Sequence, residues 1–162
     1  MKRFSRIGLA AVFSICIALG LSAVMHGFDL NRSTVPSEPI HLTDHNLVDF
    51  ISQVQMQNRI SRVDWTEPVL IIDLKWPEEA ARSTLYDDYA QLLSNAFVQT
   101  KNVDRLFIRA LEWREDDRSE LKEWLQADRE HFFMQDYADW TNREITSEGW
   151  IKQRFELKGS RA

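Results

Sequence analysis

The pattern of hydrophobic and polar positions divides the chain into an apolar leader and a mixed remainder. Residues 7–25 form a run of 19 without a charged side chain, preceded by Lys2, Arg3 and Arg6. A helix of that length spans about 28 Å, which matches the apolar thickness of a bilayer. Because basic flanks stay in the cytoplasm, we expect a cytoplasmic segment 1–6, a transmembrane signal-anchor over 7–25 and an exported remainder.

A cleaved signal peptide is the alternative interpretation of this segment. Such peptides have a shorter apolar core and are cleaved after small residues, and the best candidate cleavage site here is Gly20-Leu21-Ser22. The length of the run favours the uncleaved, single-pass anchor. Residues 26–40 are polar and contain two prolines, so we expect a linker that leads to an extracytoplasmic domain over 41–162.

Within the domain, apolar residues recur first at helical and then at alternating spacing. Helical spacing over 43–58 predicts a first helix. Alternation predicts strands over 62–65 and 69–76, joined as a hairpin by a turn that contains proline. Pro77 followed by two glutamates is typical of a helix start, so a second helix is expected from there to about residue 100.

The remaining chain is expected to add one strand and then helices. Residues 103–113 alternate and predict a third strand, and Ser119 is a suitable N-cap for a helix. Residues 147–157 fit both a helix and a strand, and we favour the helix. The predicted fold is α+β: after the transmembrane helix comes a small α-β-β-α-β domain with a three-stranded antiparallel-type sheet and a helical, aromatic-rich C-terminal tail.

The expected sheet has one face for the helices and a second, mixed face. Leu70, Ile72 and Leu74 should be buried under the helices, together with Leu106 and Ile108. The second face mixes apolar and charged side chains, which is typical of an interaction surface. We expect residues 119–157 to fold back over part of it and the rest to bind a partner. The candidate partner-binding residues are Asp73, Arg105, Phe107, Arg109, Leu111 and Trp113.

Composition narrows the range of functions. The chain has 162 residues with 25 acidic and 20 basic side chains, a net charge of −5, which argues against a nucleic-acid partner. No glycine occurs between Gly27 and Gly149, although nucleotide-binding loops and nucleophile elbows need glycine for their sharp turns. Cys16 is the single cysteine and lies in the apolar run, so the domain has no disulfide and no cysteine nucleophile.

Several polar clusters could carry chemistry, and each also has an ordinary structural interpretation. His41, His45 and Asp49 have a spacing that suits metal ligands, but His41 precedes the expected helix and no fourth ligand is evident. Adjacent carboxylates on a helix point about 100° apart and cannot converge on a substrate alone. We therefore expect no catalytic residue, no cofactor and no metal. The other clusters are Asp87-Asp88, Asp116-Asp117 and His131 beside Glu130.

These patterns together predict a membrane-anchored protein-interaction module without catalytic activity, with a protein partner in the cell envelope or with itself as partner. The expected order α-β-β-α-β over about 43–113, behind an N-terminal anchor, resembles the ring-building modules of bacterial secretion and sporulation channels. That resemblance in element order implies the alternative of a self-assembling envelope scaffold subunit. A third alternative is an envelope hydrolase with an unrecognised carboxylate site.

Overall fold

The computed structural model describes residues 38–113 and 119–159. The predicted span 7–25, the residues that flank it up to 37, and the Asp116-Asp117 pair all lie outside the described residues. Among the residues described, no helix has both the length and the apolar character needed to cross a membrane.

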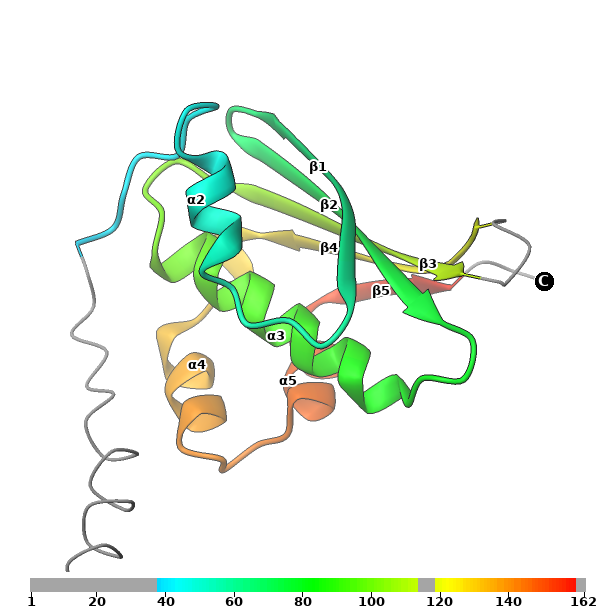
Figure 1. The fold of residues 1–162 in the computed structure, drawn as a ribbon. Coiled ribbons are helices and arrows are strands. Elements are labelled where there is room, and N and C mark those ends of the chain that lie inside the picture. Colours follow the sequence, from blue (N-terminus) through cyan, green and yellow to red (C-terminus); the bar gives the residue numbers. More distant parts are fainter. Residues whose placement is uncertain (1–37, 114–118, 160–162) are drawn as a thin grey trace, which may run out of the picture. The chain divides into compact units, whose positions relative to one another are not determined.

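The domain is an α+β fold built on one five-stranded mixed sheet (Figure 1). The strands lie in the order β1-β2-β3-β4-β5, so each strand pairs with its neighbours in sequence. The elements are α2 (Leu47–Ser52), β1 (Arg59–Thr66), β2 (Val69–Pro77), α3 (Arg82–Val98), β3 (Arg105–Trp113), β4 (Ser119–Asp128), the 3-10 turn η1 (Arg129–His131), α4 (Met134–Thr141), α5 (Ser147–Arg154) and β5 (Glu156–Gly159).

The expected order α-β-β-α-β is confirmed over α2 to β3. The expected three-stranded, antiparallel-type sheet is wrong, because the sheet has five strands and one of its pairings is parallel. β1 and β2 form the predicted antiparallel hairpin, whereas β2 and β3 pair in parallel. Parallel neighbours need a crossover of a dozen or more residues, and the long helix α3 with its flanking loops supplies it. Pro77 ends β2 and does not open this helix, which begins at Arg82.

The segment after Ser119 is a strand where the sequence favoured a helix. Along β4, Glu123, Leu125 and Ala127 are buried while the residues between them are half-exposed, which is the period of two of a strand. Leu121, Trp124 and Leu125 also match a helical spacing, so the local pattern admitted both structures. Residues 147–157 combine the two interpretations, because α5 ends at Arg154 and β5 follows.

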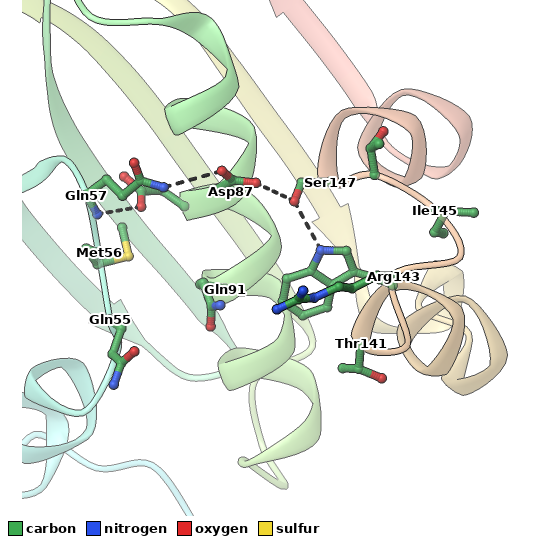
Figure 2. A pocket seen from close by; sticks show the side chains of 12 residues that line it. Gln55, Met56, Gln57, Asp87, Gln91, Thr141, Arg143, Ile145 and Ser147 are labelled. Carbon is green, nitrogen blue, oxygen red and sulfur yellow. Dashed lines mark hydrogen bonds between the residues drawn. The ribbon is translucent and has the colours of Figure 1, made fainter. Parts of the chain in front are cut away.

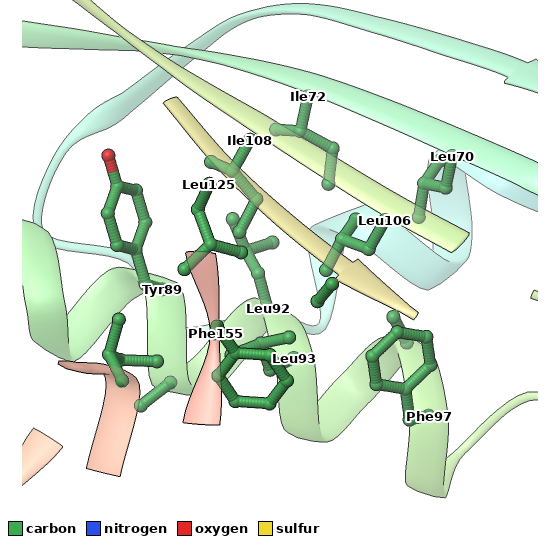
Figure 3. Packing of buried hydrophobic residues seen from close by; sticks show 14 of the residues in the cluster. Leu70, Ile72, Tyr89, Leu92, Leu93, Phe97, Leu106, Ile108, Leu125 and Phe155 are labelled. Carbon is green, nitrogen blue, oxygen red and sulfur yellow. The ribbon is translucent and has the colours of Figure 1, made fainter. Parts of the chain in front are cut away.

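The core lies between the sheet and helix α3. Leu70, Ile72 and Leu74 of β2 and Leu106 and Ile108 of β3 are fully buried, as predicted. They face apolar side chains of α3 and lie beside the buried Leu125 of β4 (Figure 3). The α3 residues in this contact are Tyr89, Leu92, Leu93 and Phe97.

The C-terminal tail packs on the helical side of the sheet, so the expectation that it covers the second face is wrong. Helices α4 and α5 lie on the same side as α3 (Figure 1). Trp150 of α5 is 1% exposed, stacks on Trp140 at 5.2 Å and meets Phe132 edge to face at 5.8 Å between ring centres. The aromatic residues of the tail thus bury one another against α3, so their burial does not require contact with the second face of the sheet.

Candidate functional site

One face of the sheet is not covered by any helix of the described residues, and we call it the open face. Its side chains alternate with the buried ones, and its apolar members are half-exposed and lie outside the core cluster. The open face consists of Arg59, Arg62 and Asp64 of β1; Val69, Ile71, Asp73 and Lys75 of β2; Arg105, Phe107, Arg109, Leu111 and Trp113 of β3; Leu121, Trp124, Gln126 and Asp128 of β4; and Glu156 and Lys158 of β5.

The structure brings all six predicted partner-binding residues together on this face. Asp73 and Arg109 are directly opposite each other in the parallel pairing of β2 and β3. The Nε and Nη2 of Arg109 donate to the two Asp73 oxygens at 2.6 and 2.8 Å. These hydrogen bonds raise the pKa of the Arg109 guanidinium, against the opposing effect of its partial burial. This bidentate pair holds the Asp73 and Arg109 side chains in a defined geometry across β2 and β3.

Aromatic rings and cations alternate around that centre. Lys75 places its Nζ 3.5 Å from the centre of the Trp113 ring, which is a close cation–π contact. The rings of Phe107 and Trp124 lie 6.2 Å apart, and the Lys158 Nζ lies 4.8 Å from the Trp124 ring. Apolar area and positive charge are therefore interleaved across the face.

The edge of the face towards the end of β4 holds a second ion pair. Arg105 Nε donates to Asp128 Oδ1 at 2.7 Å, and both side chains remain partly exposed. Leu111 lies opposite Lys75 on one side and Leu121 on the other. The sequence missed the contribution of Trp124 and Asp128, because residues 119–128 were interpreted as a helix; their alternation was the signal that could have found them.

A second candidate is a hollow of about 820 Å³ between α3, the segment before β1 and the turn between α4 and α5 (Figure 2). Ser147 Oγ donates to Asp87 Oδ1 at 2.6 Å and accepts from Trp140 Nε1 at 3.1 Å. No histidine lines the hollow, so the serine has no imidazole base beside it.

The aspartate pair on α3 has structural roles. Asp88 is 1% exposed and accepts 2.8 Å hydrogen bonds from the backbone N–H groups of Gln57 and Asn58 and from the Asn58 side chain. These bonds tie the segment before β1 to α3. Asp88 is thus not part of a solvated helix surface, because its carboxylate satisfies backbone donors that the turn leaves free.

The histidine candidates do not come together. His41 Nε2 lies 3.2 Å from Asn102 Nδ2 and 3.7 Å from Glu67. His131 Nε2 lies 3.9 Å from Glu130, and both side chains are exposed. Among residues 38–113 and 119–159, no group of three or more potential ligands could hold a metal ion.

The chain was compared with protein-family models, with curated proteins and with solved structures, and none of them matches it. The features of this protein that bear on its function are therefore the geometry of the open face and the sequence of the amino terminus.

Proposed function

We propose that this protein is a membrane-anchored, extracytoplasmic protein-interaction module without catalytic activity, and that the open face is its binding surface. The observation that carries the proposal is a five-stranded sheet whose second face, within the described residues, is free of any helix and carries the aromatic side chains of Phe107, Trp113 and Trp124. An uncovered sheet face that mixes half-exposed apolar side chains with charged ones is typical of a surface that a partner covers.

Two further observations support this proposal over a catalytic one. Asp73, the most buried carboxylate of the open face, is fully engaged by Arg109, and Asp88 is fully engaged by backbone donors. Carboxylates held in this way organise the fold and are poorly placed to exchange protons with a substrate. Arginine, tryptophan and phenylalanine, which supply seven of the eighteen residues of the open face, are residue types enriched in protein interfaces.

The proposed location rests on the sequence. The uncharged run 7–25 behind Lys2, Arg3 and Arg6 supports a single-pass anchor with a cytoplasmic amino terminus. The polar linker 26–40 would then hold the domain near the outer surface of the membrane, where its partner would be another envelope protein or a second copy of this chain.

Site-specific photo-crosslinking in the native membrane tests the proposal. A photoreactive amino acid replaces Phe107 on the open face of the full chain. The matched controls are Val48 and Met134, which are 75% and 59% exposed apolar residues on the helices. We expect protein crosslinks at position 107 and few at either control. Equal yields at all three positions would contradict the proposal, and a crosslink to the same chain would identify the self-assembling scaffold.

A further inference from the structure

Charge is distributed unevenly over the described residues. Together, residues 38–113 and 119–159 contain 21 Asp and Glu against 13 Lys and Arg, a net charge of −8. The open face carries six of these cations and only four of the carboxylates, so its net charge is +2. The remainder of the described surface and core therefore carries −10. The open face is therefore net cationic, although the described residues as a whole are acidic.

Most cations of the open face are neutralised within it. Arg109 is paired with Asp73, Arg105 with Asp128, Arg62 with Asp64 at 2.8 Å, and Lys158 with Glu156 at 3.2 Å. The excess charge is thus localised on the two cations that remain.

Those two cations, Arg59 and Lys75, are directly opposite each other in the antiparallel pairing of β1 and β2. Neither has a carboxylate partner among the described residues, although like charges at such positions repel each other. Asp73 is the residue of β2 that neighbours Lys75 on the open face. Its carboxylate cannot pair with the two cations because both of its oxygens accept hydrogen bonds from Arg109. Trp113, whose ring lies under Lys75, adds apolar area to this corner.

We propose that the corner of the open face formed by Arg59, Lys75 and Trp113 binds an acidic segment of a partner protein. This inference rests on the proposed function and specifies the chemistry of its partner. Carboxylates of the partner would remove the repulsion between the two cations, and an apolar side chain beside them would cover the tryptophan ring. An anionic membrane is the less suitable occupant, because it would repel the −8 charge of the domain that carries the corner.

The test uses the full chain in its native membrane, with a photoreactive amino acid in place of Leu111, which lies opposite Lys75. One background is unchanged, and a second carries Arg59→Glu and Lys75→Glu. The matched control carries Lys101→Glu and Arg143→Glu, which change the total charge equally at exposed sites away from the open face. Crosslinked peptides are sequenced by mass spectrometry.

We expect the crosslink to reach an Asp- and Glu-rich peptide, to fall at least tenfold in the Arg59→Glu/Lys75→Glu background and to persist in the control. Exchange of the peptide's acidic residues for lysine should then restore the crosslink to the reversed corner. A crosslink to a peptide without acidic residues, unaffected by the reversal, would overturn the acidic-segment inference and leave the interaction module standing. Lipid adducts alone, or no crosslink above that of the helix controls, would overturn both.

Discussion

At the scale of single residues, buried polar groups of this domain are matched to partners, with a few instructive exceptions. Tyr89 of α3 is fully buried, and its hydroxyl has no hydrogen-bond partner within the described part of the chain. Burial, followed by the nearby charge of Glu123, raises the pKa of Tyr89 far above its ordinary value. The folded protein therefore keeps this proton at a pH where the unfolded chain releases it.

That difference predicts a loss of stability in alkali. Above about pH 10 the unfolded chain binds one proton fewer at this site than the fold does, so the free energy of unfolding falls by about 1.4 kcal/mol per pH unit. Tyr89→Phe should leave the free energy of unfolding at pH 7 unchanged or slightly higher, and should make its decline above pH 10 shallower. Urea titrations of both proteins between pH 7 and 11 measure the effect. Parallel declines would contradict the assignment to Tyr89.

Arg129 shows the opposite situation, because each of its three guanidinium nitrogens donates to a backbone oxygen. Its guanidinium donates to the backbone oxygens of Phe97 at 2.7 Å, Val103 at 2.8 Å and Thr100 at 3.0 Å. It thereby joins the end of the sheet to the C-terminus of α3, where a positive charge also complements the helix dipole.

Arg129→Lys keeps that charge and removes the planar fork that reaches three carbonyl groups. We expect the free energy of unfolding to fall by about 1–3 kcal/mol, because partly buried carbonyl groups lose their donors. Arg143→Lys, at an exposed arginine, should change it by less than about 0.5 kcal/mol. Denaturant titration of the two variants measures these free energies of unfolding. Equal decreases in both variants would mean that the planar guanidinium of Arg129 contributes little to stability.

At the scale of elements, the alternation along β2 determines which face of the sheet is buried. Ile72 is fully buried beneath α3, and its neighbour Ile71 is half-exposed on the open face. A shift of one residue in the pairing of β2 would exchange the two environments.

Substitution of the two isoleucines by asparagine therefore measures the register directly. Ile72→Asn buries an unpartnered amide and removes core contacts, which should cost about 3–5 kcal/mol of a total near 5–15. Ile71→Asn should cost about 1 kcal/mol or less, because its amide stays in contact with water. Thermal melts followed by circular dichroism compare the variants, and similar melting temperatures would show that the assigned register is wrong.

At the scale of the whole molecule, the functional proposal depends on the side of the membrane on which the domain lies. Lys2, Arg3 and Arg6 should keep the amino terminus in the cytoplasm and direct everything beyond residue 25 outward. A reporter enzyme that is active only after export, fused after Ala162, should therefore be active. The control lacks residues 7–25 and should keep the reporter inactive in the cytoplasm. Activity of a cytoplasm-restricted reporter on the intact chain would contradict the proposed orientation.

Local hydrophobic periodicity is sufficient to predict the elements whose pattern has a single interpretation. The hairpin of β1 and β2, the helix α3 and the strand β3 all follow from local periodicity, and so does the burial of Leu70, Ile72 and Ile108. The six predicted partner-binding residues share one face for the same reason, since alternate residues of a strand must point the same way.

How these elements pair and pack depends on contacts between residues far apart in the sequence. The parallel pairing of β2 and β3 depends on where α3 returns the chain to the sheet. The residue spacing of β4 also suits a helix, and β4 is a strand because it pairs with β3. The aromatic tail packs on the helical side of the sheet because Trp150 contacts the rings of Phe132 and Trp140 there. Long-range packing therefore left the second face open, which no local pattern in the sequence encodes. The opposition of Arg59 and Lys75, in contrast, follows from the register of the β1–β2 hairpin and its shift between Ile60 and Arg62.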